Sequence, residues 1–346
     1  MNGNGVSGAS PRRPRPTIED VAAAAGVSRG TVSRVLNGGV NVSAPALAAV
    51  NKAIKQTGYV VNHHARSLVT QRSRSVAFIL CEPQEKFFED PNFPTLLRGC
   101  TQALAEHDMP LLLSIAGTEE DRERVVRFIA AGHIDGALLV STHAGNPVID
   151  RLLGLGVPAV ACGLPIGHEH DLAYVAVNEA EGARQATAHL AGLGKTRIAT
   201  VTGPLDTSGG RDRLAGYRDA LRAAGLEQDE ALIAHGEYTQ ASGESAMAKL
   251  LDQAPDLDAV FVASDLMAVG AIEALTRAGK RVPQDVSVVG FDDSTAALAA
   301  RPRLTTVRQP YRRISEEMVR LLLARLDGQD PAAVILPTEL VHRASA

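Results

Sequence analysis

A short run near the start of the chain carries side chains that hydrogen-bond well to nucleic acid. From Ser28 onward, apolar residues recur at helical spacing and would form one buried face, at Val32, Val35 and Leu36. The other positions of this helix are small, hydroxylic or basic, namely Arg29, Gly30, Thr31, Ser33 and Arg34. A short helix with such an outer face suits the major groove of DNA.

The residues before this run predict the element that holds the helix in place. Thr17 can cap a first helix, with Asp20 three residues later as an imperfect capping box. Gly26 would end that helix in the left-handed conformation that glycine tolerates. Ser28 can then cap the second helix. The pattern therefore predicts two short helices joined by a tight turn.

A third helix should complete this small region. Ser43 is its predicted cap and Gly58 its end, with Tyr59 closing the shared core. The inner face of this helix is predicted at Leu47, Val50 and Ile54.

These residues resemble a known family. The string from Ala25 to Ser28, followed by the string from Thr31 to Asn37, is similar to the amino-terminal helix-turn-helix of the LacI/GalR family of bacterial repressors. The resemblance implies that a homodimer binds a palindromic double-stranded DNA operator. Arg29 and Gly30 match the two main specificity positions of the family. Arg29 could bind a guanine edge, whereas Gly30 implies either lost specificity or a close backbone approach.

The segment from Asn62 to Val69, which follows the third predicted helix, has a cap and helical composition. It spans only about two turns, so such a helix is marginal alone in water. The resemblance implies a hinge helix that orders on DNA beside its dimer mate, with Leu68 as an apolar wedge in the minor groove. His63 and His64 depart from the family pattern. They could make DNA binding pH-sensitive, or could simply face solvent or phosphate. The DNA-binding residues are thus predicted to be Thr17, Ser28, Arg29, Gly30, Thr31, Ser33, Arg34, Asn37, Tyr59, Asn62, Ala65, Arg66 and Leu68.

The length and charge of the chain indicate a small basic amino-terminal region followed by a larger acidic region. The chain has 346 residues, which indicates two or three domains. Residues 1–75 carry ten Lys and Arg against two Asp and Glu, a net charge of +8, whereas the remainder carries 25 against 37, a net charge of −12. A basic head on an acidic body fits a phosphate-binding module attached to a domain that avoids DNA.

Cysteine usage and hydropathy bear on location. The three cysteines are scattered without CxxC spacing, which is typical of free thiols in a reducing cytoplasm. No apolar run approaches the ~20 residues of a membrane span, and the first 16 residues lack the apolar core of a signal peptide. We therefore expect a cytoplasmic protein without membrane contact.

Beyond residue 75, buried strands alternate with helices, which predicts parallel sheets with right-handed crossovers. Two successive sets, split near residues 173–178, suggest two similar lobes. This arrangement resembles the periplasmic-binding-protein fold of the family, in which the chain crosses between lobes three times, so the helix Tyr311–Leu326 should return to the first lobe. The fold class is thus a small all-α helix-turn-helix head plus a two-lobed α/β domain. The predicted segments are a disordered tail (1–16), the DNA-binding domain (17–61), the hinge and linker (62–75) and the effector-binding and dimerisation domain (76–346).

Ligands of open parallel sheets bind beyond the carboxyl ends of the strands. Carboxylates there could accept hydroxyl donors from a sugar, and a guanidinium could donate two hydrogen bonds. By resemblance, Arg213 and Asp292 match effector contacts, and Tyr238 and Phe93 are expected as aromatic rings. Gly163 and Ser264 depart from residues that some sugar-responsive members carry. The predicted effector site is Glu82, Phe93, Ser141, Arg213, Tyr238, Ser264, Asp265, Phe291 and Asp292.

Structural alternatives exist for several of these residues. Asp265 could be only a helix cap, Arg213 could form a surface bridge with Asp219 or Glu237, and Tyr238 could be core. The run from His168 to His170 invites a metal interpretation, but no further ligand is evident, so we expect a solvated loop and no metal.

The sequence therefore predicts a transcriptional repressor of carbohydrate uptake or catabolism genes that a sugar or oligosaccharide releases from its operator. Some family members use a corepressor or a protein partner, so the sequence leaves open whether the effector weakens or strengthens operator binding. A sugar receptor without a DNA role is a rival, against which the basic head argues. No catalytic triad is evident, so we expect neither an enzyme nor a cofactor.

Overall fold

The computed structural model describes residues 16–36, 42–59 and 73–346. The chain folds as two compact units, residues 1–71 and 72–346. Each unit has its own core and is described by itself.

The first unit contains three short helices around a small apolar core. They are α1 (Ile18–Ala25), α2 (Arg29–Leu36) and α3 (Ala44–Thr57). Val21, Val32 and Val50, one from each helix, are fully buried. The predicted capping box is present at the start of α1, because Thr17 accepts from the Asp20 N–H and Asp20 accepts from the Thr17 N–H. Gly26 ends α1 with φ of +67°, as expected for a left-handed cap.

The start of α3 differs from the sequence prediction. Ser43 precedes the helix, but its side chain makes no capping hydrogen bond. Pro45 lies in the first turn, where its missing N–H costs no intrahelical bond and its fixed φ already suits the helix. Leu47, predicted on the inner face, is 38% exposed, so Val50 and Ala53 provide the buried face.

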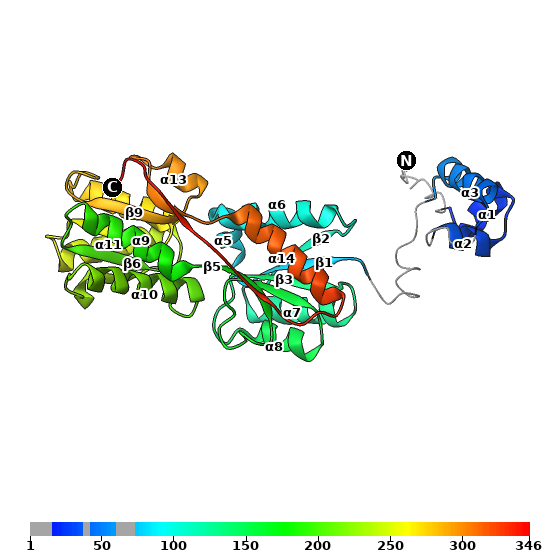
Figure 1. Ribbon diagram of the computed structural model, residues 1–346, viewed down its shortest axis with the longest axis horizontal. Helices are drawn as coiled ribbons and strands as arrows, with labels where there is room; N and C mark the ends of the chain where they lie inside the picture. Colours follow the sequence, from blue (N-terminus) through cyan, green and yellow to red (C-terminus); the bar gives the residue numbers. More distant parts are fainter. Residues whose placement is uncertain (1–15, 37–41, 60–72) are drawn as a thin grey trace, which may run out of the picture. The chain divides into compact units, whose positions relative to one another are not determined.

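The second unit consists of two lobes, each built on a six-stranded sheet. The first sheet has the order β11-β5-β4-β3-β1-β2 and is parallel throughout. The second has the order β12-β10-β9-β8-β6-β7 and is parallel except for the β10–β12 pair. Helices pack on both faces of each sheet (Figure 1).

The first lobe comprises β1 (Val76–Leu80), α5 (Gln84–Glu89), α6 (Asn92–Ala105), β2 (Leu111–Ile115), α7 (Glu119–Ala130), β3 (Gly136–Val140), α8 (Pro147–Gly154), β4 (Ala159–Cys162), β5 (Ala173–Val177), α14 (Tyr311–Leu326) and β11 (Ala333–Leu336). The second lobe comprises α9 (Glu179–Gly192), β6 (Ile198–Thr202), α10 (Ser208–Ala223), a 3₁₀ turn (Glu230–Leu232), β7 (Ile233–His235), α11 (Gln240–Gln253), β8 (Ala259–Val262), α12 (Asp265–Arg277), β9 (Ser287–Asp292), α13 (Thr295–Ala299), β10 (Thr305–Arg308) and β12 (Glu339–Val341).

The chain crosses between the lobes three times, which the fold resemblance predicted. The crossings follow β5, β10 and β11, because the next element in each case belongs to the other lobe. The expected return of the helix from Tyr311 to Leu326 is confirmed, since α14 packs on α6 and on β3, β4 and β5. Figure 1 shows α14 lying across the first lobe and the red carboxyl-terminal segment extending from that lobe to the second.

Several short strands were not predicted from the sequence. Residues 173–177 form β5 in the first sheet, so the chain leaves the first lobe just after this stretch rather than within it. The strands β7, β10, β11 and β12 were also missed. Each has only three or four residues.

Candidate DNA-binding and effector sites

The outer face of α2 presents the polar residues that the sequence singled out. Arg29, Gly30 and Arg34 are exposed, whereas Thr31 and Ser33 are half-buried. Ser28 caps the helix, because its Oγ accepts the Thr31 N–H at 3.2 Å. The cap and the buried Val32 on the opposite face together fix the direction in which this polar face points.

The two arginines of this face are bound only by weak surface contacts in the described head. Arg29 Nε lies 3.2 Å from Glu19 Oε1, and the two side chains are 73% and 60% exposed. Arg34 Nε donates to the carbonyl of Gly30 at 3.3 Å. An ion pair this exposed contributes about 0–1 kcal/mol, so DNA can displace Glu19 at little cost.

The remaining predicted DNA contacts divide into two groups. Thr17 caps α1, and Tyr59 packs against the core of the head from the end of α3. The predictions for Asn37, Asn62, Ala65, Arg66 and Leu68, and with them the hinge helix, lie outside the described residues.

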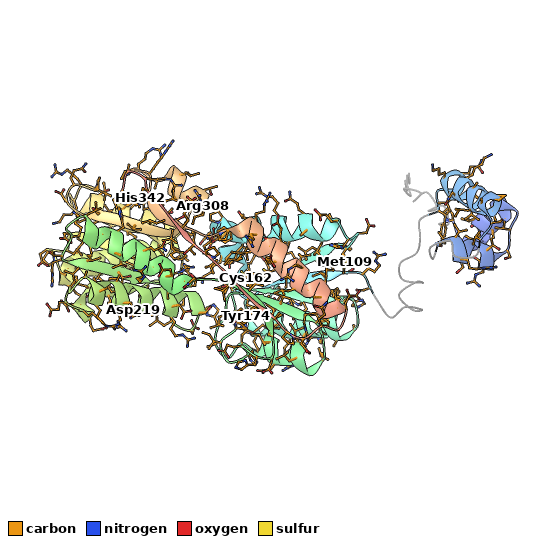
Figure 2. The ribbon with its side chains drawn as sticks, in the orientation of Figure 1. Met109, Cys162, Tyr174, Asp219, Arg308 and His342 are labelled. Atoms are coloured by element: carbon orange, nitrogen blue, oxygen red, sulfur yellow. The ribbon has the colours of Figure 1, made fainter. Side chains whose placement is uncertain are left out.

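A cavity of about 850 Å³, counting its solvent-open part, lies between the two lobes of the second unit. Cys162, which lines it, is labelled close to the junction of the lobes in Figure 2. Six of the nine predicted effector residues line this cavity, and they come from both lobes: Phe93, Ser141, Arg213, Tyr238, Ser264 and Asp292. Ser141, Ser264 and Asp292 lie at or just after the carboxyl ends of β3, β8 and β9, and Tyr238 follows β7, so the parallel sheets bring these four together. Arg213 and Phe93 reach the cavity from the helices α10 and α6.

Arg213 is the central cation of the cavity. Its Nε donates to Glu179 Oε2 at 2.7 Å, and its Nη1 lies 3.9 Å from Asp292 Oδ1. The guanidinium also stacks 3.8 Å from the centre of the Phe291 ring. Burial opposes its charge, but the carboxylates outweigh burial, so the pKa of Arg213 lies above its usual value. The alternative surface bridge to Asp219 or Glu237 is therefore wrong.

Asp292 connects the cavity to a crossing between the lobes. Its Oδ1 accepts from Gln309 Nε2 at 2.7 Å and from Tyr311 Oη at 3.2 Å. Burial raises the pKa of Asp292, although Arg213 and the amide donors oppose this shift. Gln309 lies between β10 and α14, and Tyr311 is the first residue of α14, so this carboxylate touches the chain where it passes from one lobe to the other.

Asp90 adds a second carboxyl group to the cavity from the first lobe. Its Oδ1 accepts the Asn92 N–H at 2.8 Å. Burial raises the pKa of Asp90 to about 7, and the nearby charge of Asp292 adds to the shift. The cavity thus holds two carboxyl groups whose ionisation is unfavourable unless a ligand or cation compensates it.

The backbone is strained at three of the lining residues. Ser141, Tyr238 and Asp292 have positive φ angles of 56°, 59° and 120°. Residues other than glycine rarely adopt this conformation, and it concentrates at binding sites. Tyr238 packs directly over Gly203, where an added Cβ would lie 2.1 Å from the ring, so only glycine fits there.

Three predicted effector residues do not line the main cavity. Asp265 is fully buried behind it, where it accepts from the Ser294 N–H and from Thr306 Oγ1. The cap of α12 is Ser264, which accepts the Met267 N–H, so the interpretation of Asp265 as a cap is also wrong. Phe291 lies beneath Arg213 rather than in the cavity. Glu82 lines a smaller adjoining cavity, which shares Ser141 and Tyr238 with the main one.

Sequence reasoning missed a group of polar residues that line the cavity, namely Asp90, Asn92, Glu179, Gln309 and Tyr311. Glu179 begins a helix, so it looked like an ordinary first-turn carboxylate, and Asp90 lies between two helices without a motif. Gln309 and Tyr311 carry no motif and enter the site only because the chain crosses there.

The remaining predictions concern features away from the cavity. His168 Nε2 lies 3.6 Å from Asp150, and the described residues contain no cluster able to hold a metal ion. Within the same described ranges, no helix is both long and apolar enough to cross a membrane.

Comparisons with known proteins agree with this geometry. Residues 17–62 match the model of bacterial regulatory proteins of the lacI family, and residues 187–346 match a periplasmic binding protein-like domain. The chain is 46% identical to the HTH-type transcriptional regulator CelR of Thermobifida fusca over 96% of this chain and 99% of that one. It is 34% identical to the ribose operon repressor of Escherichia coli K12, over 90% and 93% of the two chains.

Solved structures lead to the same family. A complex of the transcriptional regulator CelR with cellobiose has a TM-score of 0.78 and 44% identity, and covers 96% of this chain and 100% of that one. The Lac repressor dimer bound to operator and the anti-inducer ONPF has a TM-score of 0.84 and 27% identity, and covers 96% of this chain and 99% of that one. This chain therefore belongs to the LacI family of bacterial regulatory proteins.

Proposed function

We propose that two copies of this chain bind a palindromic operator, and that binding of a neutral sugar in the cavity between the lobes causes the protein to dissociate from the operator. The observation that carries this proposal is the composition of the cavity. Of the charged side chains that line it, three are carboxyl groups and one is a guanidinium: Asp90, Glu179, Asp292 and Arg213.

This charge balance favours a polyhydroxyl ligand over an anion. Arg213 is already bonded to Glu179, so it has little capacity left for a phosphate or carboxylate. Carboxylates accept hydrogen bonds from sugar hydroxyls, and the aromatic rings of Phe93, Tyr238 and Tyr311 offer apolar faces to a pyranose. An anionic sugar would place its charge beside the carboxyl groups of Asp90, Glu179 and Asp292, which repel it when they are ionised.

The relatives suggest which sugar to test first. A CelR relative is solved with cellobiose, so cellobiose is the first probe for this chain. Because both lobes line the cavity, a ligand that bridges them stabilises one lobe arrangement and can change the affinity for DNA by population shift.

The test measures operator binding by fluorescence anisotropy, with a duplex selected from a random palindromic pool. Saturating cellobiose should weaken binding, glucose 6-phosphate should have no effect, and Arg213→Ala should bind DNA but ignore the sugar. Arg222→Ala, which removes a 67% exposed arginine on the same helix, is the matched control. Failure to bind any duplex would refute the proposal that the chain is a DNA-binding regulator. Stronger DNA binding in the presence of sugar would indicate that the sugar acts as a corepressor.

We also infer that the chain leaves its ligand chemically unchanged. The support for this inference is that the relatives named above are transcriptional regulators. Cellobiose incubated with the protein should therefore be recovered intact by chromatography, and the appearance of glucose would contradict this inference.

A further inference from the structure

The imidazole of His143 bridges the two lobes beside the cavity. His143 follows β3 of the first lobe, and its Nε2 lies 3.0 Å from Oε1 of Glu82 in the same lobe. Its Nδ1 lies 2.9 Å from Oδ2 of Asp206, in the β6–α10 loop of the second lobe. The same loop accepts a backbone bond, from the Ala144 N–H to the Asp206 carbonyl at 2.7 Å.

An imidazole between two carboxylates can satisfy both only when it is protonated. Both nitrogens donate in the imidazolium, whereas the neutral ring has one donor and one lone pair. Loss of the proton therefore places a lone pair against a carboxylate at one of the two contacts. One contact must then break or take in water.

The structure indicates which contact breaks. The Glu82 side chain is only 6% exposed and also accepts from Ser141 at 2.7 Å and pairs with Lys86 at 3.0 Å. The Asp206 side chain is 56% exposed and can be hydrated instead. The neutral ring should keep its bond to buried Glu82 and release Asp206, which is the half of the bridge that joins the lobes.

We propose that His143 is a proton-operated latch that holds the two lobes together beside the effector cavity. The charged groups that act on it are Glu82, with Lys86 behind it, and Asp206. Glu82 contributes most to raising the pKa of His143 above its ordinary value, burial opposes this, and Asp206 adds to the rise. The latch is thus closed at low pH and opens as the pH rises through this raised pKa.

The effect on the effector rests on the proposed function, whereas the latch itself does not. A sugar that contacts both lobes should bind more weakly as the latch opens. Asp90 titrates in the same cavity, so the comparison must be between the wild type and a variant that removes only the bridge. Asp206→Asn is that variant, because Asp206 lies outside the residues that line the cavity.

The experiment is a double-mutant cycle of thermal unfolding on the full chain. The proteins are the wild type, His143→Gln, Asp206→Asn and the double variant, at pH 5.5 and pH 8.5. At the lower pH each single variant should lower Tm by about 2 °C, and the double variant should lower it little further, because both break the same bridge. At the higher pH the two changes should no longer be coupled. His168→Gln is the control, since its half-buried ring pairs with Asp150 of its own lobe.

Additive single effects, or a coupling that is equal at both pH values, would overturn the latch. If His143→Gln fails to fold, Asp206→Asn against the wild type still tests it through the pH dependence of Tm. Cellobiose affinity supplies the second arm: it should fall several-fold more between pH 6 and pH 8.5 in the wild type than in Asp206→Asn. If cellobiose does not bind at any pH, the sugar proposal fails, while the unfolding cycle still decides the latch.

Discussion

At the scale of single residues, the buried charges of the second unit's cavity gather around one guanidinium, that of Arg213. Arg213 is 6% exposed and is the shared partner of Glu179 and Asp292. A buried ion pair is weak evidence for stability in itself, but removal of one partner leaves a charge without compensation. We therefore expect the same residue to serve both ligand binding and the integrity of the cavity.

Arg213→Ala should abolish sugar binding and destabilise the second unit by about 3 kcal/mol, because it leaves the carboxyl groups of Glu179 and Asp292 without their shared cation. Calorimetry with cellobiose and urea unfolding measure the two effects. Arg222→Ala on the same helix should change stability by less than about 0.5 kcal/mol, because its pair with Asp219 is exposed. Equal effects of the two variants would contradict this assignment.

Asp90 predicts a pH dependence of stability. Its pKa of about 7 in the folded protein exceeds that of the unfolded chain, so folding favours the protonated form. Stability is therefore lost as the pH rises from about 4 to about 7, by at most about 4 kcal/mol and by less where water screens the half-buried group. Asp90→Asn should remove this component of the decline. Urea unfolding at pH 5 and pH 8 measures it, with exposed Asp252→Asn as the control.

Arg29 carries a prediction for DNA. Arg29→Ala should weaken operator binding by about 1–3 kcal/mol, the usual value of a bidentate arginine–guanine contact. Stability should change by less than about 0.5 kcal/mol, since the pair with Glu19 is exposed. Anisotropy with matched and mismatched duplexes separates base reading from phosphate contact: equal losses on all sequences would make Arg29 a phosphate ligand.

At the scale of elements, α2 combines a polar face with a weak helix former at its second position. Gly30 is exposed, and a Cβ there would meet only Ser28 Oγ at 3.8 Å. The fold therefore has room for a side chain at this position, and the tertiary structure of the head does not require glycine.

Gly30→Ala should stabilise the head by about 0.5–1 kcal/mol, because alanine loses less conformational entropy in a helix. Gly26→Ala is the matched variant and should destabilise it, since Gly26 has φ of +67°. Hydrogen exchange of the α2 amides in the full chain measures both changes. If Gly30→Ala stabilises the helix but weakens DNA binding, the glycine serves close approach of the backbone to DNA.

At the scale of the whole molecule, the charge asymmetry separates the two activities. Residues 1–75 carry +8 and the rest carries −12, so the head supplies the phosphate affinity. Ser73 and Arg74 are bound by their backbone N–H groups to Asp135, which ties the start of the second unit to the first lobe.

A chain without residues 1–71 should lose DNA binding and keep the full thermal shift with cellobiose. This truncation retains Ser73 and Arg74 and so should leave the first lobe intact. In the complete protein, operator affinity should fall steeply with salt, with a log–log slope near −0.9 for each phosphate contacted. Persistent DNA binding by the truncated chain would contradict the assignment of DNA binding to the first unit and of sugar binding to the second.

The sequence by itself determined the local features of this protein. The capping box at Thr17, the left-handed Gly26 and the apolar face of α2 all follow from interactions within a few residues, and all are present. Most strands and helices of the lobes were also predictable from local sequence, because the strands are runs of buried apolar residues and the helices carry apolar residues at helical spacing.

The tertiary structure decided what enters the cavity. Gln309 and Tyr311 reach it through a crossing of the chain, and Asp90 meets Asp292 from the opposite lobe. The bridge from His143 to Asp206 joins residues 63 positions apart. Such contacts depend on how two sheets are placed, and no short-range pattern encodes that placement, so the polar network in and beside the cavity emerged only from the folded chain.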